Sequence, residues 1–152
     1  MEYSFNSENE ARVVIRSAVM EDSPVLADLS RQLGYPSTGA QTAIRLSHLL
    51  NKQDHIILVA VLPDDRIIGW MHLVISQRLE CDAFLEIAAL IIDHSSRNQG
   101  IGKQMVLAAL QWAAEHHLSN VVVRSNIIRE DAHRFYKRHG FSYIKTQRYF
   151  SS

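Results

Sequence analysis

The run from Arg97 to Gly102 separates a stretch typical of a strand from a stretch typical of a helix, and it constrains the fold more than any other part of the sequence. It reads Arg-Asn-Gln-Gly-Ile-Gly. Glycine lets a backbone turn tightly and approach a ligand, so successive N–H groups can converge on one anion. The first turn of the following helix adds unpaired donors and a positive dipole end, and the Arg97 guanidinium adds a planar donor fork. We therefore expect an α/β protein in which this loop holds the phosphate of a cofactor.

The segments on either side of the loop support a unit of strand, loop and helix. Residues 85–92, Leu-Glu-Ile-Ala-Ala-Leu-Ile-Ile, are apolar at nearly every position, as in a strand covered on both faces. From Ile101 to Ala113 the apolar residues recur at helical spacing. Since glycine also marks ordinary tight turns, Gly-x-Gly after a strand is a weak signal when it stands alone.

Hydrophobic periodicity predicts the other elements. Strands are expected over residues 11–17, 55–62, 67–76, 83–92, 120–125 and 141–150. Helices are expected between the start signal at residues 22–24 and the stop signal at residues 34–36, and over about 38–51, 100–116 and 130–139. The order βααβββαβαβ predicts a mixed central sheet with helices on both faces. Because the sequence contains no repeat or linker, residues 1–152 are expected to form a single domain.

The composition argues against several classes of partner. Sixteen basic residues balance sixteen acidic ones, so no net field would draw the protein to nucleic acid or to an anionic membrane. No apolar run approaches the ~18 residues of a membrane span, and the N-terminus lacks the pattern of a signal peptide, so we expect a cytoplasmic protein. Cys81 is the only cysteine, and no histidines or carboxylates have metal-ligand spacing, so neither a disulfide nor a metal is expected.

Two motifs in the second half resemble those of the GNAT superfamily of N-acetyltransferases. Residues 90–102, Leu-Ile-Ile-Asp-His-Ser-Ser-Arg-Asn-Gln-Gly-Ile-Gly, resemble its acetyl-CoA signature, Arg/Gln-x-x-Gly-x-Gly/Ala. Asn126 and then residues 131–141, Asp-Ala-His-Arg-Phe-Tyr-Lys-Arg-His-Gly-Phe, resemble the second motif, an Asn after a strand and an Ala-x-x-Phe-Tyr helix closed by Gly-Phe. The resemblance covers residues 12–150 and is strongest from residue 82 onward. Within the superfamily, the second motif most resembles enzymes that acetylate small amines, aminoalkylphosphonate acetyltransferases among them.

The resemblance implies an acetyl-CoA-dependent N-acetyltransferase that acts on a small-molecule amine, with a homodimer as its expected assembly. The pantetheine arm of the cofactor would pair with the strand backbone at residues 90–92, and the pyrophosphate would lie on the loop N–H groups. The acceptor pocket would be built largely from residues 31–50 and 76–84. The implied cofactor-binding residues are Leu90, Ile91, Ile92, Arg97, Asn98, Gln99, Gly100, Ile101, Gly102, Lys103, Asn126, His133 and Tyr136.

Tyr136 is the candidate proton donor to the thiolate that leaves when the amine attacks directly. It lies where the family places its thiolate-facing tyrosine, and a phenol with a pKa near ~10 is protonated at neutral pH. The alternative is a tyrosine packed in the core, at helical spacing from Ala132. Asn126 also has an alternative role, as a turn residue.

Glu86 is the candidate general base. A carboxylate within an apolar strand is costly unless it is paired or has a task, and its removal from water favours the protonated form, so it could accept a proton through one water. The alternative role is a salt bridge with Arg78 or Arg124. His133, close to Tyr136 on the same helix, is a weaker candidate base. Strand alternation is expected to place on one face Glu86, Ala88, Leu90 and Ile92.

Other functions remain open at this point. A dinucleotide-binding oxidoreductase is disfavoured because Met105 occupies the third glycine position and the next strand ends without the expected acid. A catalytically silent CoA-binding regulatory module would keep the loop but has no reason to keep Tyr136 together with Glu86. A protein or peptide amine is the other class of acceptor. If the closer resemblance holds, the acceptor carries an anionic group, and the arginines available to clamp it are Arg31, Arg78 and Arg129.

Overall fold

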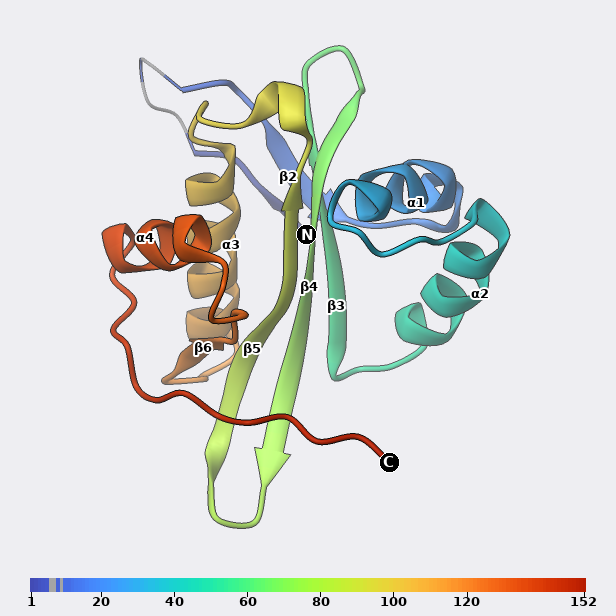
Figure 1. Cartoon of the computed structure of the whole chain (residues 1–152). Coiled ribbons are helices and arrows are strands. Elements are labelled where there is room, and N and C mark those ends of the chain that lie inside the picture. The colour runs from blue at the N-terminus through green and yellow to red at the C-terminus, as the bar shows by residue number, and fades with distance from the viewer. Residues whose placement is uncertain (6–7, 9) are drawn as a thin grey trace.

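The computed structural model describes residues 1–5, 8 and 10–152 and contains one six-stranded sheet with helices on both faces (Figure 1). Neighbouring strands are antiparallel except β5 and β6, which are parallel, so the sheet is mixed and the predicted fold class is confirmed. In sheet order the strands are β1 (Glu2–Tyr3), β2 (Val14–Ser17), β3 (His55–Val61), β4 (Ile67–Arg78), β5 (Cys81–Ile92) and β6 (Val121–Val123).

Two helices cover each face of the sheet. Helices α3 (Ile101–Glu115) and α4 (Glu130–Arg138) lie on one face, and α1 (Ser23–Gln32) and α2 (Gly39–Leu50) lie on the other (Figure 1). Thr38 begins α2 with a capping box, because its hydroxyl accepts from the Gln41 backbone N–H and the Gln41 side chain accepts from the Thr38 N–H. The predicted helices therefore form close to their expected bounds.

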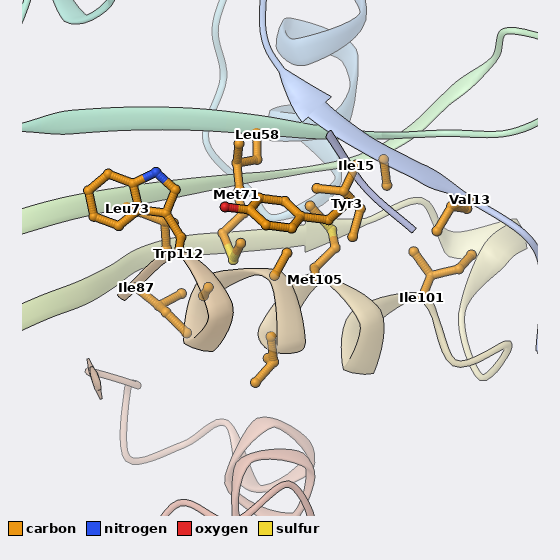
Figure 2. Close-up of a cluster of buried hydrophobic side chains, with 14 of the residues drawn as sticks. Tyr3, Val13, Ile15, Leu58, Met71, Leu73, Ile87, Ile101, Met105 and Trp112 are labelled. Atoms are coloured by element: carbon orange, nitrogen blue, oxygen red, sulfur yellow. The ribbon is translucent and has the colours of Figure 1, made fainter. Parts of the chain in front are cut away.

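The larger core lies between α3 and the sheet. Trp112 and Met105 on α3 point toward side chains from the central strands, Met71 and Leu73 among them (Figure 2). A smaller apolar cluster lies on the other face, where Leu26 of α1 and Leu46 of α2 cover β3. Strand β5 lies between β4 and β6 and has apolar contacts on both faces, which explains its near-continuous run of apolar residues.

The prediction of a last strand over residues 141–150 is wrong. After α4 the chain runs without regular secondary structure to its end, and its large apolar side chains are exposed. A segment becomes a strand only when a neighbouring strand satisfies its backbone groups, and residues 141–150 pair with no strand of the described chain. The exposed side chains of this segment are Tyr143, Ile144, Tyr149 and Phe150. The structure also adds the two-residue strand β1, which carries no periodic signal.

A β-bulge in β5 changes which side chains share a face. Consecutive residues of β4 pair with Ile87 and Ala89, so Ala88 is one extra residue on β5. The bulge reverses the alternation, and the expectation that Glu86 shares a face with Leu90 and Ile92 is therefore wrong. Leu90 and Ile92 pack against the core under α3. On the opposite face, β5 carries Glu86, Ala89 and Ile91.

Candidate active site

The sheet opens at the end of β5. Strand β6 pairs with β5 only over residues 85–87, the last pair being Ile87 with Val123. Within the described part of the chain, no strand pairs with residues 88–92 on the β6 side. The backbone of this segment can therefore form a ladder with an extended ligand, as in strand addition to a sheet edge. The expected pantetheine contacts at Leu90, Ile91 and Ile92 fall on this segment.

The glycine loop connects the open edge to α3. Asn98 and Gly100 both have positive φ, 61° and 77°, and Gly100 is the N-cap of α3. This alternation of backbone conformation can turn neighbouring N–H groups toward one point, and the first turn of a helix leaves its donors unpaired. The Gln104 N–H already bonds to the Gly100 carbonyl, so the unpaired donors lie before residue 104. The loop fits an anion, and its role with pyrophosphate stays a prediction.

Side chains beside the loop make specific contacts. Arg97 Nε donates to the Ile92 carbonyl at 3.3 Å, and Lys103 Nζ donates to Glu10 Oε1 at 2.9 Å. Gly100 has a positive φ, which favours glycine, and a Cβ there would lie 2.6 Å from Glu10 Cγ, so an added side chain would also have to displace Glu10. The Gln99 amide donates to the Ser95 carbonyl at 3.4 Å. Because of these contacts, replacing Gly100 should disturb the local fold as well as the anion site.

Helix α4 packs against the start of α3. A Cβ at Gly102 would lie 3.1 Å from the Phe135 ring, and the neighbouring Tyr136 ring makes an edge contact with Phe141 at a centroid distance of 5.6 Å. Burial raises the pKa of the Tyr136 phenol, and the positive charge of Arg129 opposes that shift. Tyr136 is thus protonated at neutral pH, as a proton donor must be, and it also takes part in packing.

Asn126 and His133 contact each other at the turn before α4. Asn126 Oδ1 accepts from the Ile128 N–H at 3.2 Å, and His133 Nε2 lies 2.9 Å from the Asn126 carbonyl oxygen. These contacts match the turn role that the sequence offered as the alternative for Asn126. Their expected contacts with the cofactor stay predictions.

Glu86 forms the salt bridge that was the alternative to a base role. Arg124 Nε lies 3.2 Å from Glu86 Oε1, and 19% of the Glu86 side chain is exposed. Arg78 is not its partner, because that guanidinium lies 5.5 Å above the Phe84 ring. Since the carboxylate is partly exposed, a water can still reach it.

A cavity of about 310 Å³ lies on the Glu86 face of the sheet, under α1 and α2. Residues 26–49 of the two helices and their connection form its roof, which agrees with much of the expected acceptor region. None of residues 76–84 lines this cavity, because the β4–β5 hairpin carries them to its far end, and their expected contribution to the acceptor pocket stays a prediction. The floor comes from the sheet, namely Ile57, Trp70, His72, Ala89 and Ile91. Ala89 and Ile91 connect the cavity to the open segment of β5.

No local sequence pattern indicates the close pair of histidines beside the cavity, of which His72 lines the floor. His55 Nδ1 and His72 Nε2 lie 2.8 Å apart, from the neighbouring strands β3 and β4. Burial, reinforced by the nearby His55, lowers the pKa of His72 to about 4, so that imidazole is uncharged at neutral pH. The strand register that brings the two rings together is a long-range property and leaves no local signal.

The described residues hold no group of three or more histidines, cysteines and carboxylates that could bind a metal ion. Among them, no helix has the length and apolar character required to cross a membrane.

Comparison with known proteins places this geometry in a family. The family model described as the acetyltransferase (GNAT) family matches residues 24–141. No curated protein sequence shows a significant match. An aminoglycoside N-acetyltransferase solved in complex with CoA superposes with a TM-score of 0.82 at 14% identity, covering 97% of this chain and 99% of that chain.

Two further solved structures are similar. An aminoglycoside 6'-N-acetyltransferase from Acinetobacter haemolyticus has a TM-score of 0.78 at 15% identity and covers 91% of this chain and 97% of its own. A GNAT family acetyltransferase from Staphylococcus aureus has a TM-score of 0.74 at 20% identity, with 92% and 97% covered. At these identities the three structures establish a shared fold.

Proposed function

Since the chain belongs to the GNAT family of acetyltransferases, we propose that it transfers the acetyl group of acetyl-CoA to the primary amine of a small molecule by direct attack. One observation carries this proposal: the open segment of β5 lies between the glycine loop and the cavity. A donor held along the backbone of residues 88–92 and an amine held over Ala89 would meet at the same strand.

The donor would be held mainly by backbone groups. The edge at residues 90–92 would pair with the pantetheine arm, and the N–H groups of residues 98–103 would take the pyrophosphate, with the Arg97 guanidinium beside them. Asn126, His133 and Tyr136 would lie toward the thioester end. Lys103 would contribute through its backbone, because its ammonium group is bound to Glu10.

Two side chains would move the protons. The ammonium form of the acceptor must lose a proton before its nitrogen can attack, and Glu86 would accept that proton through a water. The bond between the carbonyl carbon and sulfur then breaks, and the Tyr136 phenol would donate its proton to the departing thiolate, whose conjugate thiol has a pKa near ~8.5. The Arg124 contact would hold the Glu86 carboxylate in a fixed orientation between turnovers.

A small-molecule acceptor is favoured by the shape of the pocket. A cavity of about 310 Å³ roofed by two helices is near the lower end of the ~300–1,000 Å³ of small-molecule sites. A protein or peptide acceptor would need a longer surface groove. A catalytically silent module would have no need of a cavity that meets the open edge.

Release of free CoA thiol from acetyl-CoA, measured over a panel of primary amines, tests the proposal. We expect amine-dependent release, and with Glu86→Gln a rate about tenfold or more lower at neutral pH and a pH profile without its acidic limb. Arg124→Gln is the control, because it removes the salt bridge and keeps the carboxylate. Tight acetyl-CoA binding with no release for any amine would identify a silent module, and release with peptides alone would identify a peptide acetyltransferase.

A further inference from the structure

The cavity under α1 and α2 is apolar along most of its wall. The side chains that form this part come from α1, α2 and the three central strands, and they include Leu26, Leu33, Leu49, Ile57, Trp70 and Ile91. A hydrocarbon or aromatic group that enters such a cavity gains roughly 25 cal/mol for each Å² of apolar surface removed from water. The volume of about 310 Å³ suits one molecule of the size of an amino acid.

One end of the cavity is polar and is formed by hydroxyl and guanidinium groups that can donate hydrogen bonds. Ser37 and Thr42 lie with their hydroxyl oxygens 2.8 Å apart, and Arg45 Nη1 donates to Ser37 Oγ at 3.3 Å. In the described part of the chain, Arg45 forms no ion pair with a carboxylate. The guanidinium is thus held at the cavity by a neutral hydroxyl and keeps most of its donors for another partner.

Among the residues that the structure describes, Arg45 is the one charged side chain that lines the cavity. No aspartate or glutamate of this part of the chain lines it, and the His72 imidazole is uncharged at neutral pH because burial and the nearby His55 lower its pKa to about 4. A ligand with one anionic oxygen group would be attracted to this site, and a polycation would meet a positive charge without any compensating carboxylate.

The arginines that the sequence suggested as clamps do not line the cavity. Arg31 is paired with Asp28, and its other nitrogen donates to the Ser37 carbonyl at 2.9 Å. Arg78 lies over the Phe84 ring, and Arg129 lies before α4. The sequence could not single out Arg45, because its place at the cavity depends on how α2 packs on the sheet.

We propose that the acceptor is a primary amine with an apolar body and one anionic oxygen group, a carboxylate or a phosphonate, and that Arg45 binds this group. The inference rests on the proposed acetyl transfer and names its substrate class. Arg45 and the Ser37 and Thr42 hydroxyls would hold the anionic group, the apolar wall would cover the body, and the amine would lie over Ala89 beside the open edge of β5. Apolar amino acids and their aminophosphonate analogues have this form.

The test is a set of amines matched in their apolar body. Phenylalanine, its phosphonate analogue, phenylalanine amide and phenethylamine are compared as acceptors, together with spermidine and an aminoglycoside, by release of CoA thiol. We expect kcat/KM to be at least about tenfold higher for the carboxylate or the phosphonate than for the two amines that lack an anion, a difference of about 1.4 kcal/mol. The phenylalanine and phosphonate arms show which oxygen group is preferred.

Arg45→Gln separates the role of the side chain from the general reaction. It should raise KM for the anionic acceptor about tenfold, leave KM for acetyl-CoA unchanged, and leave the phenethylamine rate unchanged. Arg66→Gln is the control, because Arg66 is an exposed arginine in the β3–β4 turn, away from the cavity. Equal use of all the matched amines, a preference for spermidine or the aminoglycoside, or an Arg45→Gln enzyme with unchanged KM would overturn the inference.

A binding measurement distinguishes failure of the anion site from failure of the acetyl transfer reaction. If no amine releases thiol although acetyl-CoA binds, calorimetric binding of phenylalanine and of N-acetylphenylalanine still decides the role of Arg45. Binding weakened about tenfold in Arg45→Gln supports the anion site, and equal binding or no binding to the parent protein rejects it.

Discussion

The two sides of β5 offer a ligand different kinds of groups, and only one of these kinds leaves a motif in the sequence. On the α3 side, the open strand edge and the loop with positive φ at Asn98 and Gly100 present backbone groups. On the α1 side, the cavity is lined by side chains from two helices, their connection and three strands. A site made of backbone needs glycines at fixed positions and so leaves a local motif, whereas a site made of dispersed side chains leaves none.

The faces also differ in charge. The loop side combines Arg97, Lys103 and the helix dipole of α3, with Glu10 compensating one charge. Among the described residues, Arg45 is the one side chain lining the cavity that is charged at neutral pH, because burial lowers the pKa of the His72 imidazole on the floor. The proposed polyanionic donor and the proposed acceptor with one anionic group would therefore each lie against groups of suitable charge.

The largest expected effect is on the α4 side of the site, where Tyr136→Phe keeps the ring and removes the hydroxyl. We expect kcat to fall by about 100-fold, because general acid catalysis contributes roughly 10²–10⁴, while the affinity for acetyl-CoA and KM for the amine change little. Steady-state kinetics together with calorimetry measure all three quantities. A kcat within a few-fold of the parent would leave Tyr136 with its packing role alone.

The second expected effect is a loss of folding stability at acidic pH that comes from His72 on the cavity floor. The folded-state pKa of His72, about 4, lies below its usual 6.5, so the unfolded chain binds the proton more readily. The full contribution of a neutral His72 to stability is present above pH 6.5, and it is lost as the pH falls toward 4, by on the order of 2 kcal/mol.

His72→Gln should remove that loss. Denaturant unfolding at pH 7 and pH 4.5 measures it, with His48→Gln on α2 as a control at an exposed histidine. An identical fall in the free energy of unfolding for the parent and His72→Gln would show that the pKa of His72 is not lowered as its burial implies.

A smaller effect is expected at the loop. Gly100→Ala should weaken acetyl-CoA binding about tenfold and lower the free energy of unfolding by about 1–2 kcal/mol, because the alanine must adopt φ 77° and meets Glu10. Gly34→Ala is the matched control, since Gly34 has φ 79° and nothing within 4 Å of an added Cβ. If Gly100→Ala and Gly34→Ala bind acetyl-CoA with equal affinity, the loop does not take part in binding the cofactor.

The same contrast explains what the sequence could predict. The loop and the bounds of α3 and α4 follow from local rules of periodicity and capping, so their prediction was close. The bulge at Ala88 did not follow, because one extra residue in a strand is decided by the pairing with β4 and is invisible to alternation. The histidine pair and Arg45 were missed since their neighbours are set by register and helix packing. The prediction of a strand over residues 141–150 was wrong for a related reason. Local sequence does not show whether another strand will pair with a segment.

The most direct test of the division between the two faces is acetyl-CoA calorimetry and turnover of Ser30→Phe. Ser30 lines the cavity from α1, and a ring there would fill space needed by the acceptor. Ser47→Phe on α2, which does not line the cavity, is the control. We expect Ser30→Phe to keep the parent affinity for acetyl-CoA and to lose at least about tenfold in kcat/KM for the amine. Acetyl-CoA affinity that falls together with turnover in Ser30→Phe, but not in Ser47→Phe, would contradict separate donor and acceptor faces.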